Sequence, residues 1–450
     1  HAAMTFPEFK NASRWLQLAS TSLQQQMAAA VYDDGVHIEQ SVGYHRVCAL
    51  AFDRFRNESV RTGHPVPRWF ALKLEQMIDY LARVQDVRGF SAMNSDANLD
   101  YQRIMTRNWA AIFNRSDWLY IATGGRQGSV PVCADGSSIP STLWPWTGQL
   151  LSRDGWRRHR RSEWLWMDVG PHGSGHGHND KLSLALRYGD FPLLVDSGIA
   201  VYSGSFEWAR AYVRSAKAHS TALLGGRFGQ HAAFEHIEED FAAQPLPRHS
   251  YKLSKEFDFV RASVRLDTSS DGHYHASNCT ANHTRALHYV RGKSLWLVVD
   301  RMQFDRDPSH CSWSSNGGFL WTSWHVHPNA TVSASCATAA TLATQQRCLA
   351  SVVHRSGNAS LTIAMDSDVK TAIFNHSVAT GIDDTNPDVT GPPQGWYSPR
   401  YGTIIASPVL KIASAGSVCN GEFAPDHQSC PGPPNVRTRQ SVTVAWALAA

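Results

Sequence analysis

A stretch from Trp164 to Gly225 limits the fold of this 450-residue chain more strictly than any other. Its centre, residues 170–181, reads Gly-Pro-His-Gly-Ser-Gly-His-Gly-His-Asn-Asp-Lys. Residues 182–188 then alternate between apolar and other side chains, the period of a strand whose two faces meet different surroundings. A further apolar run ends in Asp196-Ser-Gly198. We therefore predict a sheet that carries polar side chains at the ends of its strands.

Three of these polar residues form a candidate metal site. His178, Asp196 and His219 each adjoin the end of a predicted strand. Two imidazoles and one carboxylate, with a fourth position open, are a ligand set that suits Zn²⁺. The alternative is that glycine-flanked histidines are solvated loop residues. In an extended backbone His176 points to the opposite side from His178, which would let it face a substrate.

The same stretch resembles a known family. The blocks His-Gly-His-Asn-Asp-Lys-Leu, Leu-Leu-Val-Asp-Ser-Gly and Arg-Ser-Ala-Lys-Ala-His-Ser-Thr are similar, in this order, to the heparinase II/III-like polysaccharide lyases, including their alginate-lyase-like branch. The resemblance implies an α+β fold, with an incomplete α/α toroid of N-terminal helices followed by a large antiparallel β-sandwich region. It also implies cleavage of a uronic-acid-containing polysaccharide, such as alginate or a glycosaminoglycan, by β-elimination.

The resemblance also implies roles for single residues. Family members hold a metal ion with the residues that match His178, Asp196 and His219, and the residue that matches His176 belongs to the active cleft. We therefore expect one structural zinc ion. It would order the loop that carries His176 rather than bind the substrate, because ligands at strand ends pull the sheets together.

A second block, from Asp34-Gly through Glu39-Gln-Ser to Tyr44-His, also resembles the family. There the matching tyrosine acts as general acid and often as base, which makes Tyr44 a catalytic candidate beside His176, a second candidate base or stabiliser. The alternative is a tyrosine whose hydroxyl anchors the start of a helix. The candidate substrate-binding residues are Glu39, Gln40, His45, Tyr202, Tyr212 and Arg214.

Two further expectations concern these candidates. An acid and a base that serve one sugar ring must both reach it, so Tyr44 and His176 should face each other across a cleft between the helical and β regions, within about 10 Å. Tyr202 and Tyr212 lie where some alginate-lyase relatives carry a second tyrosine. Arg214 either pairs with a carboxylate or braces its own loop, and bracing is the favoured interpretation.

The chain divides into two regions of different periodicity. Apolar residues recur at helical spacing in residues 13–30, with Ser13 as N-cap, and in three further segments up to residue 113. From Trp144 onward, alternating runs between turn residues predict strands. We therefore expect a partial toroid domain at residues 1–140 and an antiparallel β-sheet domain at residues 141–450.

One part of the family's site has no counterpart ahead of Tyr44. Family members usually carry an Asn-His pair several dozen residues before the tyrosine, where it neutralises the substrate carboxylate. The 43 residues before Tyr44 contain no such pair. We expect that an N-terminal part of the toroid or a partner chain supplies it, or that the protein has lost this part of the site.

Sequons and cysteines predict a secreted, extracellular glycoprotein. The asparagines of the eight Asn-x-Ser/Thr sequons are Asn11, Asn57, Asn114, Asn278, Asn282, Asn329, Asn358 and Asn375. The eight cysteines include no Cys-x-x-Cys spacing, which favours disulfides over a cysteine zinc site. The favoured local bridges join Cys336 with Cys348 and Cys419 with Cys430.

The charge and hydropathy of the sequence limit the kinds of binding partner that we expect. The net charge of +4 is mild and fits an anionic polysaccharide, and no long charge block indicates nucleic acid. No run reaches the roughly 18 to 20 apolar residues that a membrane span needs. The basic run at residues 157–161 is either a solvated hairpin tip, the favoured interpretation, or a processing or polyanion-binding site.

Two rival functions remain open. One is a non-catalytic glycan-binding or structural matrix protein on the lyase scaffold, which the absent Asn-His pair favours. Tyr44 and His176 count against it. The other is a uronosyl C5-epimerase, which abstracts the same proton but returns it to C5.

Overall fold

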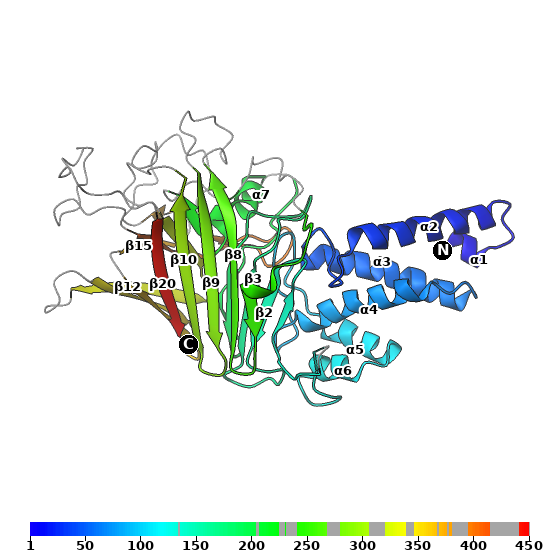
Figure 1. Cartoon of the computed structure of the whole chain (residues 1–450), viewed down its shortest axis with the longest axis horizontal. Helices are drawn as coiled ribbons and strands as arrows, with labels where there is room; N and C mark the ends of the chain where they lie inside the picture. The colour runs from blue at the N-terminus through cyan, green and yellow to red at the C-terminus, as the bar shows by residue number, and fades with distance from the viewer. Residues whose placement is uncertain are drawn as a thin grey trace.

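The computed structural model describes residues 1–133, 136–203, 207–224, 230, 241–267, 280–305, 320–338, 346–366, 369–375, 378–379, 395–414 and 441–449. Within these residues, helices come first along the chain and antiparallel strands follow. Figure 1 shows helices α1–α6 at one end of the molecule and the sheets at the other. The α+β class expected from the sequence is confirmed.

The helical part packs around one core. Its helices are α1 (Ala2–Thr5), α2 (Ala12–Ala30), α3 (Val42–Arg61), α4 (Arg68–Arg83), α5 (Arg103–Ile112) and α6 (Ser116–Ala122). In α4, Phe70, Leu74 and Leu81 are fully buried, as expected for one face of an amphipathic helix. The prediction of Ser13 as N-cap is wrong, because α2 begins one residue earlier with Asn11 as its N-cap.

A five-stranded antiparallel sheet lies against these helices. Its strands are, in sheet order, β1 (Thr142–Trp144), β2 (Gln149–Arg153), β3 (Glu163–Asp168), β4 (Leu184–Tyr188) and β5 (Phe191–Leu194). In β3, Trp164 and Trp166 pack into the helical core, whereas Leu165 and Met167 pack into the core of the other sheets. Successive residues of a strand point to opposite faces, so this sheet is buried on both faces and joins the two parts.

Two larger antiparallel sheets complete the β region. The eight-stranded sheet has the order β12 (Ala330–Thr338), β13 (Gln346–His354), β14 (Ser360–Asp366), β20 (Ser441–Ala449), β10 (Leu295–Phe304), β9 (Thr280–Val290), β8 (Phe257–Asp267) and β7 (Tyr251–Leu253). The other has the order β16 (Val378–Ala379), β15 (Val369–Asn375), β19 (Pro408–Ser414), β11 (Leu320–His325) and β6 (Ala222–Leu224). Trp296 on β10 and Trp324 on β11 are fully buried in the core that these sheets share.

Short elements connect the sheets. They are helix α7 (Glu207–Arg214), the 3-10 turns η1 (Ala216–Ala218) and η2 (Arg248–Ser250), and the strand pair β17 (Trp396–Tyr397) and β18 (Ile405–Ala406). The basic run at residues 157–161 is exposed in the connection between the paired strands β2 and β3. Arg158 forms an ion pair of 2.6 Å with Asp190 there. The solvated-hairpin interpretation of this run is confirmed.

The cysteines agree only in part with the expectation of disulfides. Cys48 and Cys133 carry free thiols, so the expectation does not hold for these two residues. The register of β12 and β13 places Cys336 directly opposite Cys348, and their bridge stays a prediction. The other four cysteines, Cys279, Cys311, Cys419 and Cys430, lie outside the described residues.

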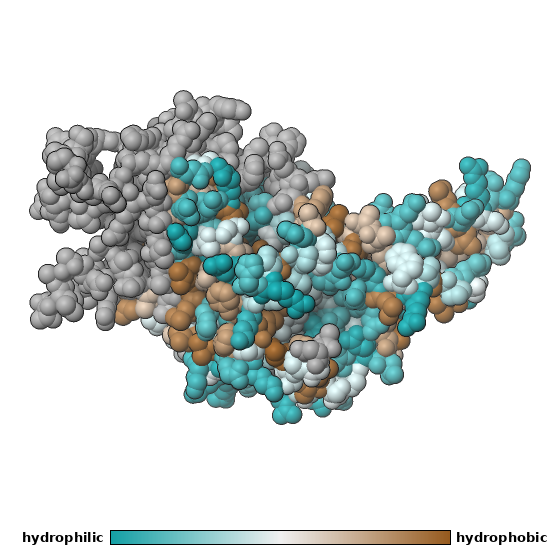
Figure 2. Space-filling view, viewed as in Figure 1, coloured by the Kyte–Doolittle hydropathy of each residue, from teal (hydrophilic) through white to brown (hydrophobic). Residues whose placement is uncertain are grey.

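The outer surface of the helices carries apolar side chains among polar ones. Figure 2 shows hydrophobic residues on this end of the molecule. The exposed large apolar side chains on α2 to α5 are Trp15, Leu18, Val47, Leu50, Val60, Trp69, Leu72, Ile104 and Ile112. None of the described helices is both long enough and apolar enough to cross a membrane.

Candidate active site

The N-terminus of α3 positions Tyr44. Ser41 is the N-cap of this helix, and its hydroxyl oxygen accepts a hydrogen bond from the Tyr44 backbone N–H, at 3.4 Å. An N-cap of this kind satisfies one of the N–H groups that a helix start leaves without a partner. The preceding residue, Gln40, has a φ of 62°, so the chain turns sharply just before the helix begins. Tyr44 thereby lies at the end of the helical layer.

Tyr44 and His176 lie in direct contact, whereas the sequence predicted that they face each other across a cleft. Their rings are stacked, with 3.4 Å between the ring centroids and 12° between the ring planes. This distance confirms the expectation that the two side chains lie within about 10 Å. The Tyr44 hydroxyl also forms a hydrogen bond of 2.6 Å with the Tyr202 hydroxyl. Two of the candidate residues therefore contact Tyr44 directly.

Glu39 orients the His176 ring. The Nδ1 atom of His176 lies 2.9 Å from the Glu39 carboxylate, and this hydrogen bond lowers the pKa of Glu39. An ionised carboxylate only accepts hydrogen bonds, so Nδ1 carries the proton and Nε2 keeps its lone pair. A histidine held in this tautomer by a carboxylate can act as a general base through Nε2.

Tyr202 lies between Tyr44 and a cation. The guanidinium carbon of Arg210 on α7 lies 4.8 Å from the centroid of the Tyr202 ring. Burial, followed by the hydrogen bond to Tyr44, raises the pKa of Tyr202. Tyr202 therefore stays a neutral phenol and can donate its proton to the Tyr44 oxygen.

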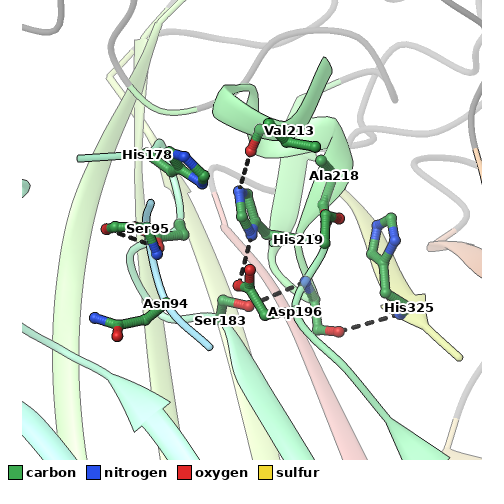
Figure 3. A network of polar contacts seen from close by, with 12 residues as sticks. Asn94, Ser95, His178, Ser183, Asp196, Val213, Ala218, His219 and His325 are labelled. Carbon is green, nitrogen blue, oxygen red and sulfur yellow. Dashed lines mark hydrogen bonds and ion pairs between the residues drawn. The ribbon is translucent and has the colours of Figure 1, made fainter. Parts of the chain in front are cut away.

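Both ring nitrogens of His219 have a hydrogen-bonding neighbour. Its Nε2 atom lies 2.8 Å from the Val213 carbonyl oxygen and its Nδ1 atom 3.0 Å from a carboxylate oxygen of Asp196 (Figure 3). A carbonyl only accepts, so Nε2 carries a proton. In a neutral ring, Nδ1 would then direct a lone pair at an anionic oxygen. This contact is favourable only when the ring is an imidazolium or when a cation lies beside both atoms. Burial opposes the charged form of His219, but Asp196 raises the pKa of His219.

His178 presents a second buried nitrogen. Its Nε2 atom lies 2.9 Å from the Asp96 carboxylate, which assigns the proton to Nε2. Its Nδ1 atom is buried and has no hydrogen-bond partner in the part of the chain that the structure describes. Burial lowers the pKa of His178, which keeps the ring neutral, the form in which imidazole binds a metal ion.

These histidines form a compact group with a carboxylate. One ligand atom each from His178, Asp180 and His219 lies within 4.8 Å of the others, and all three residues are buried. Asp196, the carboxylate predicted as a ligand, contacts the Nδ1 atom of His219 at 3.0 Å. The Nδ1 atoms of His178 and His219, next to buried carboxylates, are a donor set that fits zinc, which would take the place of a proton on His219.

Buried carboxylates surround this group. Burial raises the pKa of Asp180, and it raises the pKa of Asp168 well above its usual range. Burial opposes ionisation of Asp196 as well, but His219 lowers the pKa of this carboxyl group. Burial therefore opposes the charged form of these carboxyl groups, and a cation bound among them would offset that cost.

The backbone is strained around the site. Gln40, Ser95, Leu182 and Ala200 have positive φ angles between 53° and 64°, a conformation that residues with side chains rarely adopt. Ser95 donates from its backbone N–H to Asp180, at 3.3 Å. Leu182 directly follows the His-Asn-Asp-Lys block. Strained residues of this kind cluster at functional sites, because the surrounding contacts hold them there.

Three of the candidate substrate-binding residues have structural roles instead. His45 is buried, accepting at Nδ1 from the His37 N–H and donating from Nε2 to the Met77 carbonyl. Tyr212 is buried with its hydroxyl accepting from the Gly395 N–H, at 3.2 Å. Gln40 is buried, and its carbonyl accepts from the Gln149 side chain, at 3.0 Å. These corrections share one cause: all three side chains are buried, which keeps them away from a substrate.

Arg214 is a half-buried residue at the end of α7. Its carbonyl accepts a hydrogen bond of 2.9 Å from the Asn179 N–H, which joins α7 to the loop that carries His178. Burial lowers the pKa of the Arg214 guanidinium, and the nearby Arg210 lowers it further. This contact agrees with the bracing interpretation of Arg214.

The sequence reasoning missed Asp96, Arg210 and Asp180. Asp180 lies inside the block that carried the resemblance, so its position beside His178 was a usable signal. Asp96 lies in a polar Asn-Ser-Asp run between two helices, which reads as an ordinary turn. Arg210 belongs to a short helix that no pattern in the sequence distinguished. Both residues take their importance from contacts with segments far away along the chain.

Comparisons with known proteins match both the helical and the β part of the chain. A family model described as Heparinase II/III-like, C-terminal matches residues 148–409, and one described as Heparinase II/III N-terminus matches residues 1–120. A heparin-sulfate lyase of Bacteroides stercoris is 26% identical over 235 residues, which cover 50% of this chain and 34% of that protein. A heparin-sulfate lyase of Pedobacter heparinus is 26% identical over 231 residues, with the same coverage of 50% and 34%. The chain therefore spans about a third of the length of the curated relatives it matches.

Solved structures share the fold. A heparan sulfate lyase HepC mutant from Pedobacter heparinus superimposes with a TM-score of 0.66 at 18% identity, covering 100% of this chain and 58% of that one. The heparinase III-BT4657 gene product gives a TM-score of 0.65 at 16% identity, covering 100% and 57%. At these identities the likeness concerns the fold alone.

Proposed function

The chain belongs to the heparinase II/III-like family, and on this premise we propose that it is a polysaccharide lyase that cleaves a uronic-acid-containing polysaccharide by β-elimination. The observation that carries the proposal is the stacked pair of Tyr44 and His176, with Glu39 on one side and Tyr202 on the other. It supplies an acid and a base beside one another. The curated relatives are heparin-sulfate lyases, so a heparan-type glycosaminoglycan is the first substrate to test and alginate the second.

The proposed reaction requires one proton to leave C5 and one to reach the leaving O4. His176 accepts the C5 proton at Nε2, and Glu39 stabilises the resulting imidazolium. The C5–H electron pair forms the C4=C5 double bond as the C4–O4 bond breaks. Tyr44 donates its phenolic proton to O4, and the Tyr202 hydroxyl donates a hydrogen bond to the phenolate that remains.

We also propose one structural zinc ion at the histidine pair. His178 and His219 would bind it through Nδ1, with Asp196 as the carboxylate predicted from the sequence. The ion would supply a fixed positive charge that draws these buried groups together. His178 has no catalytic role of its own in this proposal, but it lies on the same loop as His176, two residues away. The proposed role of the site is therefore to hold that loop in place.

The helical region is proposed to be part of an α/α toroid, with a domain boundary near residue 140. The N-terminal and C-terminal family models match on either side of this position. The apolar side chains exposed on α2 to α5 would be covered by further helices of such a toroid. The same helices, or a partner chain, are the proposed source of the group that neutralises the substrate carboxylate.

Secretion with glycosylation is the proposed setting. The sequon asparagines Asn11, Asn57, Asn114, Asn282, Asn329 and Asn358 are all exposed in the structure. Exposure is a requirement for a glycan at each of them. Asn278 lies outside the described residues. An intact mass above 49.8 kDa from a glycosylating host, reversed by glycosidase treatment, would support this setting.

Ultraviolet absorbance of the unsaturated uronate product tests the lyase proposal. Heparan sulfate, heparin, hyaluronan and alginate are incubated separately with the chain, and a rising absorbance on at least one polymer is the expected result. A flat trace on all four, with binding retained, would favour the glycan-binding alternative. A flat trace with exchange of the C5 proton in heavy water would favour the epimerase.

A further inference from the structure

Asp96 contacts both the histidine pair and the environment of Tyr44 and His176. It lies in the segment between α4 and α5, and the exposed fraction of its side chain is 0%. We propose that Asp96 is a positioning residue that couples the metal site to the acid–base pair. This inference rests on the proposed lyase function. Three sets of contacts carry it.

The first set fixes the metal-binding face of His178. One Asp96 carboxylate oxygen accepts from His178 Nε2, at 2.9 Å, which leaves Nδ1 without a proton. A carboxylate behind a ligating histidine sets its tautomer and ring orientation, and removing such a partner typically weakens metal binding about 10- to 100-fold.

The second set runs from the same carboxylate to Tyr44. Arg210 forms two parallel contacts with Asp96, and the one between Arg210 Nη2 and Asp96 Oδ2 measures 2.8 Å. This fork fixes the guanidinium over the face of Tyr202, 4.8 Å from the ring centroid. Tyr202 in turn holds the Tyr44 hydroxyl, at 2.6 Å. The Asp96 carboxylate therefore links a proposed metal ligand to the hydroxyl that protonates the leaving group.

The third set uses the Asp96 backbone. Its N–H donates to the His176 carbonyl, at 3.0 Å, and its carbonyl accepts from the Ser41 hydroxyl, at 2.7 Å. Ser41 is the N-cap of the helix that carries Tyr44. Both catalytic candidates are thus held by one residue. A side-chain substitution leaves these backbone contacts in place, so it tests the two carboxylate contacts separately from the fold of the segment.

The competing interpretation is that Asp96 only stabilises the fold as a buried ion pair. Substitution of a purely structural residue would lower the melting temperature. It would not change the coordination geometry of the metal ion, and it would not lower kcat selectively while KM stays the same. Asp100 provides a matched control, because it lies in the same segment and pairs with an arginine, Arg46, at 2.7 Å. Among the described residues, Asp100 contacts neither the histidine pair nor Tyr202.

The experiment compares Asp96→Asn with Asp100→Asn in the full chain. Asn is isosteric with Asp but presents an amide to Arg210 and no charge to His178. For Asp96→Asn we expect zinc affinity to fall about 10- to 100-fold and the visible spectrum of the Co²⁺-loaded protein to change. We expect kcat to fall by a similar factor with KM within about twofold, since the buried side chain does not reach substrate. Asp100→Asn should change none of these.

A third variant separates the two carboxylate contacts. Arg210→Gln removes the contact with Tyr202 and leaves Asp96 bonded to His178, so kcat should fall while zinc affinity stays within about threefold. Wild-type zinc affinity and Co²⁺ spectrum in Asp96→Asn, or equal losses in Asp100→Asn, would overturn the inference. If the wild-type chain cleaves no polysaccharide, the proposed function fails, and the zinc and Co²⁺ measurements still decide whether Asp96 positions His178.

Discussion

The ring of Tyr44 lies flat against the ring of His176, with the centroids 3.4 Å apart. The two residues come from different parts of the fold, one from the first turn of α3 and the other from the loop before β4. The stacking therefore brings the helical and β regions together at the proposed site. It also separates two properties of Tyr44, because the ring makes the stack and the hydroxyl makes the bond to Tyr202.

Replacing Tyr44 by Phe should abolish elimination and leave the fold intact. Phe keeps the ring that stacks on His176 and removes only the proton donor. General acid catalysis typically contributes 10²- to 10⁴-fold, so kcat should fall by about this factor. Initial rates of product absorbance measure it. Tyr401→Phe is the matched control, since its ring contacts Tyr202 and, among the described residues, its hydroxyl forms no hydrogen bond with Tyr44. Full activity of Tyr44→Phe would contradict the assignment.

Replacing Glu39 by Gln should remove stability in a pH-dependent way. The pKa of Glu39 is lowered by its hydrogen bond to His176 from an ordinary value of 4.5. A carboxyl group whose pKa is lowered by folding stabilises the fold at pH values above its pKa in the unfolded chain. This contribution is lost as the pH falls through its pKa in the folded protein. Wild type should therefore melt at a higher temperature than Glu39→Gln at pH 6, and the gap should close towards pH 3.

Melting curves between pH 3 and pH 7 measure this gap. Glu8→Gln, at an exposed residue near the N-terminus, should give a gap that does not depend on pH in this way. A Glu39→Gln gap that stays constant down to pH 3 would mean that the hydrogen bond to His176 does not stabilise the protein.

The histidine pair should bind about one zinc ion per chain, because the two imidazoles and one carboxylate form a single set of protein ligands. His178→Ala and His219→Ala should each lose the ion and lower the melting temperature, because metal-binding energy adds to folding energy. Elemental analysis and calorimetry measure both effects. His64→Ala, at an exposed histidine of the helical region, should keep the ion. A protein that binds no zinc, with histidine variants as stable as wild type, would refute the site.

The cysteines should divide into two groups under thiol labelling. Cys48 and Cys133 should react with a thiol reagent in denaturant, since both are free in the structure. Cys336 and Cys348 should not react unless a reductant is added, because β12 and β13 place them directly opposite each other. Peptide mass mapping identifies each labelled residue. Labelling of the β12–β13 pair without reductant would remove the predicted bridge.

The sequence was sufficient for the class of fold and for the contact between Tyr44 and His176. Helical and strand periods are local properties, and the motif with its glycines located the loop between two strands. The sequence was not sufficient for the residues behind the site. Asp96 and Arg210 meet only after α4, α5 and α7 have packed, and no spacing within one segment encodes that meeting. The roles of Gln40 and His45 were mistaken for the same reason, because burial depends on the partner helix.

His45 provides the last prediction, which separates a structural from a substrate-binding role. Its ring is fully buried, and burial lowers its pKa to about 3. The folded protein therefore keeps this ring neutral. In the unfolded chain the ring takes up a proton when the pH falls below the ordinary histidine pKa of 6.5. Since the unfolded state binds more protons in this window, stability decreases as the pH falls from 6.5 towards 3.

A His45→Gln variant lacks this proton uptake. It should melt at a lower temperature than wild type at pH 8, because Gln lacks the buried ring that packs against Tyr80, 4.5 Å between the ring centroids. At pH 5 the difference should be smaller, by up to about 2 kcal/mol in unfolding free energy at ~1.4 kcal/mol per pH unit below 6.5. KM should not change in either case. A raised KM with unchanged stability would return His45 to the substrate-binding residues, because only a side chain that reaches the sugar affects binding without affecting the fold.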